Sequence, residues 1–236
     1  METPVNAPLK EKFHLEIAKL RSMSFKEKLE YIWEYYKLHI IAFCIIAAIM
    51  GSLLNTWVFN PPPETALFIS WNSGLLLENH MTDLSEAMEE RLLNENENKK
   101  VVVTWMFVDI NDPTSVMTSI NQLAAMVSAR MVDVFLVNSA TLLEYAEIGY
   151  IKPIEAVLAE IQYSNPSVYA RIKEEIIYAL LETEENQFSE HILGVNIGNS
   201  PLFSDLGFFK QELYFTMSIT SDNPEAVTEA LIAFFE

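Results

Sequence analysis

Apolar and polar positions divide the chain into three stretches of different character. Residues 24–37 repeat apolar side chains at spacings of three and four, residues 38–59 contain no Asp, Glu, Lys or Arg, and residues 65–236 mix short apolar runs with polar breaks. A helix of 22 residues is about 33 Å long, which matches the roughly 30 Å hydrocarbon core of a bilayer. The pattern therefore predicts one transmembrane helix at residues 38–59.

Two other interpretations of the apolar run fit it less well. A buried core helix of this length usually carries a polar face, and a signal peptide has a shorter apolar stretch that begins nearer the N-terminus. Small residues within the run nevertheless leave cleavage open as an alternative. Ser52 and Asn55, late in the run, permit a packing partner in the membrane without requiring one. Aromatic side chains at both ends suit the headgroup layers; they are Tyr31, Trp33, Tyr35, Tyr36 and Trp57.

The basic residues predict the orientation of this helix. Residues 1–37 carry seven Lys or Arg, whereas Arg91 is the only basic residue between the run and Lys99. The positive-inside rule places residues 1–37 in the cytoplasm and the C-terminal domain outside the cell. Within the leader, residues 1–23 form a cytoplasmic tail. Ser24 and Glu27 fit a capping box, which opens an amphipathic helix over residues 24–37 that we expect at the membrane interface.

Three prolines separate the apolar run from the rest of the chain. Residues 60–64 read Asn-Pro-Pro-Pro-Glu, and consecutive prolines end a helix and favour polyproline II at about 3 Å per residue. The sequence therefore predicts a short, stiff stalk that holds the following domain close to the bilayer.

Residues 65–236 predict an α/β domain. Strand patterns at 66–71, 101–108 and 132–137 alternate with helix patterns at 77–93, from Pro113 onward, and at 139–148 before Gly149. This order implies parallel strands joined by crossovers. Further on we expect helices at 154–161 and 166–179, a hairpin of 178–182 with 191–197, a strand at 213–220 and a helix at 224–235 capped near Asp222. The predicted architecture is a three-layer domain with a mostly parallel sheet and an antiparallel strand or hairpin. The core stripe of the helix after Pro113 is predicted to comprise Val116, Ile120, Leu123, Ala124 and Val127.

Several motifs carry a resemblance to a known family. The block VDVFLVNSATLLEYAEIGYIKPIEAVL, residues 132–158, resembles extracellular solute-binding proteins of bacterial ABC importers (periplasmic-binding-protein-like, type II), in which a D-V-x-x-x strand precedes a short helix and an A-x-x-G-x-x-x-P-I/L turn. The C-terminal stretch that contains SDNPEAVTEALIAFF is similar to their last strand and helix. The leader SFKEKLEYIWEYYKLHIIA resembles uncharacterised single-pass membrane proteins of Gram-positive bacteria.

The chain departs from this family in two ways. Solute-binding proteins close two lobes on a ligand, whereas the 177 residues after the apolar run suffice for one lobe and a small extension. Their lipid-anchoring cysteine is also missing, because Cys44, the only cysteine, lies inside the apolar run after Phe43. The resemblance therefore implies either a reduced binding protein or a fold retained for protein contacts.

A ligand in an open parallel sheet would lie beyond the carboxyl ends of the strands. The loops at those ends supply an indole face, amides, hydroxyls and helix N-termini, although Asn, Asp and Ser commonly occur there as caps and turn formers. The predicted ligand-binding residues are Trp71, Asn72, Ser73, Asp109, Asn111, Asn138 and Ser139.

Charge and motifs exclude several functional classes. The chain has a net charge of −18, and residues 38–236 hold eight basic and 27 acidic side chains, a net charge of −19; such a surface does not bind nucleic acid through phosphates. No nucleophile elbow or phosphate loop is present, and His80 and His191 are the only histidines after the apolar run. We therefore expect no enzyme, metal or cofactor. Two hypotheses remain: a membrane-anchored interaction or accessory domain that works with a membrane partner, or a small-molecule receptor of an importer or sensor.

Overall fold

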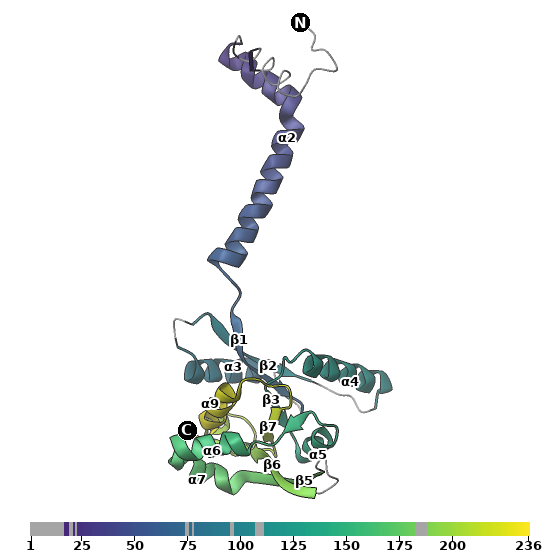
Figure 1. Ribbon diagram of the computed structural model, residues 1–236, viewed down its shortest axis with the longest axis vertical. Helices are drawn as coiled ribbons and strands as arrows, with labels where there is room; N and C mark the ends of the chain where they lie inside the picture. The colour runs from purple at the N-terminus through teal and green to yellow at the C-terminus, as the bar shows by residue number, and fades with distance from the viewer. Residues whose placement is uncertain are drawn as a thin grey trace. The chain divides into compact units, whose positions relative to one another are not determined.

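The chain divides into two compact units, residues 1–62 and 63–236. The computed structural model describes residues 17–18, 21, 23–73, 76, 78–94, 97–106, 111–182 and 188–236. Within those residues the first unit contains a long helix, and the second contains a seven-stranded sheet with helices packed against it (Figure 1).

The long helix of the first unit contains the predicted apolar run. Helix α2 spans Phe25–Leu54 and continues as a π-helical turn, η1, over Asn55–Phe59. The predicted capping box is confirmed, because the Ser24 N–H donates to Glu27 Oε2 at 2.8 Å and the Glu27 N–H donates to Ser24 Oγ at 3.5 Å. By length and composition this helix could cross a membrane, and none of its side chains is buried by the described residues. It runs without a break from the predicted interfacial segment into the predicted transmembrane segment.

The second unit is an α/β domain with a mixed sheet. The strand order is β2-β1-β3-β7-β6-β5, and the short β4 pairs with β7 beside the end of β6. Strand β1 runs parallel to β2 and β3, whereas β7 is antiparallel to β3, β4 and β6, and β5 is antiparallel to β6. The strands are β1 (Glu64–Trp71), β2 (Lys99–Trp105), β3 (Val134–Val137), β4 (Ile151–Lys152), β5 (Ile176–Glu182), β6 (Phe188–Asn196) and β7 (Tyr214–Ser218).

The expectation of a mostly parallel sheet is wrong, because only β1, β2 and β3 pair in parallel. These three strands follow the predicted alternation with helices. After β3 the chain forms the predicted β5–β6 hairpin, and β7 then runs antiparallel beside β3. Hairpin connections join antiparallel strands. The predicted succession of parallel strands joined by crossovers therefore ends at β3.

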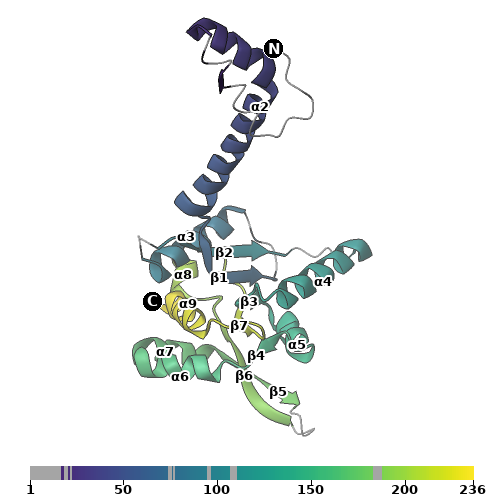
Figure 2. The same ribbon diagram turned by 45° about the horizontal axis from the view of Figure 1, so that its top comes forward.

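Helices cover both faces of the sheet (Figure 2). One hydrophobic core lies between the sheet and α3, α6, α7, α8 and α9, and a second lies between the sheet and α4 and α5. In β3, Val134 and Leu136 face the first core while Phe135 and Val137 face the second, which explains the continuous apolar run of this strand. The helices are α3 (Glu78–Leu92), α4 (Pro113–Ser128), α5 (Ser139–Glu147), α6 (Glu155–Ser164), α7 (Pro166–Ile172), α8 (Pro201–Asp205) and α9 (Pro224–Phe235).

Two predicted helical features differ from the structure. The helix expected over residues 166–179 ends at Ile172, and a 3-10 turn, η2 (Lys173–Glu175), leads into β5, whose first residues are two β-branched isoleucines. The buried stripe of α4 is also rotated from the predicted one. Leu123 and Val127 are buried as expected, but Ile120 is exposed and Met126 is buried instead. Short α8 and β4 were not predicted, because so few residues show no periodicity.

The glycines of the segment GVNIGN have a packing role. A Cβ atom on Gly198 would lie 1.6 Å from the carbonyl oxygen of Gln211, and one on Gly194 would lie 2.8 Å from that of Phe215. Both distances are far below van der Waals contact, so close backbone approach accounts for both glycines.

Candidate functional site

The carboxyl ends of β1 and β3 lie side by side, as the predicted ligand site requires. Trp71 is in register with Leu136, and the Asn72 N–H donates to the Leu136 carbonyl at 2.8 Å. The structure therefore brings residues 71–73 close to residues 138–139. Asn111 is an exposed turn residue before α4, and Asp109 lies outside the described residues.

The side chains at the end of β1 make contacts within the domain. The Trp71 ring is fully buried, and its Nε1–H donates to the carbonyl of Ser73. Asn72 donates from Nδ2 to the Tyr145 hydroxyl at 2.8 Å and accepts at Oδ1 from Ser70 Oγ at 2.8 Å. These polar groups are thus engaged inside the chain, and their role in ligand binding stays a prediction.

The predicted residues at the end of β3 open helix α5. Asn138 is the N-cap, and its Oδ1 accepts from the Thr141 N–H at 2.9 Å; Ser139 is the first helical residue. Tyr145 on the same helix faces Asn72. Burial raises the pKa of Tyr145 to about 12, although the hydrogen bond from Asn72 opposes this shift. The phenol therefore stays neutral at physiological pH and serves as an acceptor for Asn72.

An aromatic cluster covers the indole at the end of β1. The Phe208 ring stacks on Trp71 at 5.8 Å and on Phe203 at 4.7 Å, and its centroid lies 4.5 Å from that of His80. Gly207, at φ +72°, ends α8 and places Phe208 against Phe203, the apolar contact typical of this helix ending. Phe208 therefore covers the predicted indole face with a side chain of the domain itself.

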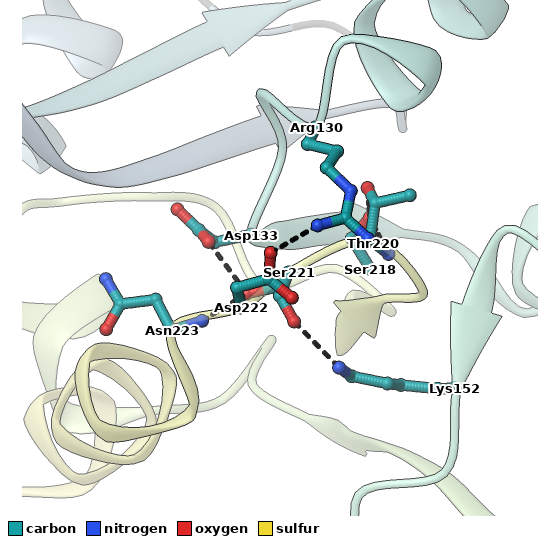
Figure 3. A network of polar contacts seen from close by, with 8 residues as sticks. All are labelled: Arg130, Asp133, Lys152, Ser218, Thr220, Ser221, Asp222 and Asn223. Carbon is teal, nitrogen blue, oxygen red and sulfur yellow. Dashed lines mark hydrogen bonds and ion pairs between the residues drawn. The ribbon is translucent and has the colours of Figure 1, made fainter.

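A polar network occupies the opposite edge of the sheet, where β1 and β3 begin (Figure 3). Asp133, just before β3, accepts at Oδ2 from the Phe68 N–H at 3.0 Å and at Oδ1 from Ser221 Oγ at 2.7 Å. Asn223, the N-cap of α9, donates from Nδ2 to the Ala66 carbonyl at 2.8 Å. The network therefore ties the start of α9 to both β1 and β3.

Two cationic side chains join this network from neighbouring segments. Lys152 Nζ donates to the Ser221 carbonyl at 2.8 Å, and Arg130 pairs with Asp222 at 2.6 Å in an exposed ion pair. Arg130 has φ +55°, a left-handed conformation that is unusual for a residue other than glycine. It ends α4 in a Schellman motif, because its N–H donates to the Val127 carbonyl and the next N–H donates to the Met126 carbonyl.

Two polar clefts open near this edge. The first, about 390 Å³, is lined in part by Arg130, Asp133 and Asp222. The second, about 410 Å³, is lined by residues that include Glu64, Glu97, Lys99, Asn223, Glu225 and Glu229. Lys99 pairs with Glu97 at 2.9 Å. Hydrogen bonds from Asn94 and then from Lys99 lower the pKa of Glu97, and the same pair raises the pKa of Lys99.

His191 lies in a hydrogen-bonded chain that links β6 to α6. Its Nε2 is 2.6 Å from Ser189 Oγ, and its Nδ1 is 3.1 Å from Glu155 Oε1, which also accepts from the Ile192 N–H at 3.0 Å. Burial opposes ionisation of Glu155, but the hydrogen bonds from Ile192, from its own backbone and from His191 outweigh it and lower the pKa. We interpret this chain as a fastening of the hairpin to the domain.

Sequence reasoning missed the polar network because its members are far apart in the chain. Asn223 before Pro224 was a visible cap signal, but nothing in the sequence pairs it with Ala66. Within the described residues, no group of three or more His, Cys, Asp or Glu side chains could hold a metal ion. No protein-family model, curated protein or solved structure matches the chain.

Proposed function

We propose that this protein is anchored in the cell membrane by α2 and that its C-terminal domain is an extracytoplasmic interaction or accessory domain for a partner in the same membrane. The observation that carries the proposal is the surface of the long helix. Its apolar side chains, Phe43, Ile46 and Leu53 among them, stay exposed after the chain has folded. Residues 38–54 of this helix carry no charged side chain, and no other segment of the described residues buries them. Such a surface is suited to lipid or to another membrane helix.

The tether and the closed strand ends favour a protein partner. Only three residues, Pro61, Pro62 and Pro63, lie between Asn60 and the start of β1. The domain therefore has little freedom to search for distant partners. Trp71 is covered by Phe208, and Asn72 is bonded to Tyr145. A small ligand at this edge would have to displace these contacts.

Co-purification in mild detergent tests this proposal. The full chain is compared with a variant in which residues 38–54 are scrambled at constant composition, and associated membrane proteins are quantified by mass spectrometry. We expect a defined membrane protein to be enriched with the native helix and lost with the scrambled one. Equal recovery, or no enrichment with the native helix, would contradict a partner contacted through the membrane.

A small-molecule receptor of the solute-binding type is the second candidate. Its support is the pair of clefts of about 390 and 410 Å³ at the amino edge of β1 and β3, since ligand pockets begin at about 300 Å³. Melting temperatures of the full chain in detergent, measured with sugars, amino acids, peptides and divalent cations, test it. A saturable rise with one class favours the receptor, and the absence of any rise counts against it.

A further inference from the structure

We propose that the outer edge of β5 binds an extended, basic segment of a partner protein, which adds to the sheet as a further strand. The inference deepens the proposed interaction function and rests on it. It assigns the surface and the partner chemistry, and it is carried by the backbone register of the β5–β6 hairpin.

The register shows which backbone groups of β5 point outward. Tyr178 faces Ile192 of β6. Both backbone groups of Ile192 point away from β5, because its carbonyl accepts from the Ile154 N–H at 2.9 Å and its N–H donates to Glu155. In an antiparallel pair, the backbone N–H and carbonyl groups of two facing residues either hydrogen-bond to each other or both point away from the partner strand. The N–H and carbonyl groups of Tyr178, and two residues later those of Leu180, therefore face the outer edge of β5.

This outer edge is open in the described part of the chain. Strand β5 is the last strand of the sheet, and no backbone hydrogen bond joins Tyr178 or Leu180 to a segment beyond it among the described residues. The far side of β6 is different, because Ile154 and Glu155 cover Ile192 there. The hairpin thus exposes a strand edge at β5, while its other edge is covered at Ile192 by the start of α6.

The side chains of β5 are apolar on the exposed face. Tyr178 is 54% exposed and Leu180 is 66% exposed, whereas Ile177 and Ala179 pack against the second core. Residues 176–181 contain no charged residue and no proline, the usual devices that protect an edge strand from pairing. An unprotected edge with exposed apolar side chains is suited to β-strand addition.

Charge selects the class of partner. Residues 173–190 contain six glutamates and one lysine, and exposed Glu190 faces Leu180 across the hairpin. Residues 38–236 carry a net charge of −19. A second copy of this chain would therefore be repelled by the first. A basic segment would be attracted instead, and alternating apolar residues in it would contact Tyr178 and Leu180.

Binding of synthetic peptides to the full chain in phosphatidylcholine nanodiscs tests the proposal. The probe is a fluorescent heptapeptide that alternates lysine and valine. The controls are the glutamate–valine peptide, the lysine–valine peptide N-methylated at every residue, and empty nanodiscs. We expect saturable binding of the first peptide only, since the methylated peptide keeps its charges but cannot donate backbone hydrogen bonds. Equal binding of the methylated peptide would show a purely electrostatic association and overturn strand addition.

Matched variants locate the binding site. Leu180→Pro removes an N–H that points outward and makes no hydrogen bond to β6. Leu180→Lys adds a positive charge that repels the lysine–valine peptide. Each should weaken peptide binding by about tenfold or more. Leu143→Lys places the same charge at an exposed leucine of α5 and should change binding less than about twofold. Circular dichroism and melting temperature confirm that each variant is folded.

Two results would overturn the proposal while leaving the proposed function intact. One is peptide binding that is unchanged by both Leu180 variants. The other is a dimer, measured by sedimentation in detergent, that Leu180→Pro converts to a monomer without any peptide binding, which would assign the edge to a second copy. The co-purification test depends on residues 38–54 and not on β5, so its result is independent of these outcomes.

Discussion

Asp133 and Ser221 are joined by a hydrogen bond of 2.7 Å between side chains that lie 88 positions apart in the sequence. The same carboxylate accepts from the Phe68 N–H of β1. One side chain, just before β3, therefore links that strand to its neighbour β1 and to the segment that leads into α9.

Replacement of Asp133 by alanine should destabilise the domain. The substitution removes both hydrogen bonds and leaves the Phe68 N–H without its acceptor, so we expect a loss of about 2–3 kcal/mol in the free energy of unfolding. Asp222→Ala is the matched control, because its exposed ion pair with Arg130 should contribute less than about 1 kcal/mol. Urea unfolding of the full chain in detergent measures both, and similar losses would refute the central role of Asp133.

The left-handed backbone of Arg130 predicts a difference between two substitutions. Arg130→Gly and Arg130→Ala both lose the ion pair with Asp222, but only glycine adopts φ +55° without strain. We expect the glycine variant to be more stable than the alanine variant by about 1 kcal/mol. Equal unfolding midpoints in urea would mean that the Schellman ending of α4 carries no strain.

Neighbouring phenylalanines provide a test of the aromatic cluster. Phe208 is buried against Trp71 and Phe203, so Phe208→Ala should cost about 3 kcal/mol or more by leaving a cavity. Phe209 is 83% exposed, and Phe209→Ala should change stability by less than about 0.5 kcal/mol. The comparison is made by thermal and urea unfolding. A loss of stability for Phe208→Ala as small as that for Phe209→Ala would mean that Phe208 does not cover the end of β1.

Glu155 predicts a dependence of stability on pH. Its pKa is lowered below 4.5 in the folded protein, so the unfolded chain binds the proton more readily. The stabilisation is therefore fully present above pH 4.5 and is lost as the pH falls through the lowered pKa.

We expect the difference in melting temperature between the native protein and Glu155→Gln to be largest above pH 4.5 and to shrink on acidification. Glu160→Gln is the control, because Glu160 lies on the same helix and its carboxylate makes none of these hydrogen bonds. Above pH 4.5 its effect on the melting temperature should be smaller than that of Glu155→Gln. A Glu155→Gln effect that does not vary with pH would contradict the role of the ionised carboxylate.

Cysteine labelling tests the predicted orientation in the membrane. In a Cys44→Ala background, Tyr163→Cys places a thiol at an exposed position of the C-terminal domain, and Glu11→Cys places one in the leader. A membrane-impermeant maleimide on intact cells should label the first variant, and should label the second only after lysis. The reverse pattern would contradict the assignment from the positive-inside rule.

Local signals in the sequence predicted the helix starts and the central strands. The capping box of Ser24 depends on a residue three positions away, and it is confirmed. The structure shows that Asp112 and Asn138 are helix caps as well, each accepting from an N–H two or three positions further on. Residues 67–71 of β1 and all of β3 were recognisable because these positions are buried on both faces and are apolar or small. The long apolar helix was likewise predictable without tertiary information, from the length of the uncharged run alone.

Long-range contacts were beyond such reasoning. Phe208 and Trp71 are distant in sequence, so the cover over the end of β1 could not be foreseen from either residue. The mixed sheet has the same origin, because the direction of β7 depends on where the chain re-enters the sheet after the β5–β6 hairpin.

The sequence by itself thus determined the apolar helix, the proline run that ends it, the acidic charge and the alternating first half of the domain, because each depends on composition or on neighbours within a few residues. The tertiary structure decided that the ends of β1 and β3 are occupied by the chain's own side chains, that a polar network gathers at their beginnings, and that β5 is an open edge. The reason is physical: hydrogen-bond partners and burial are set by which distant segments the sheet places side by side.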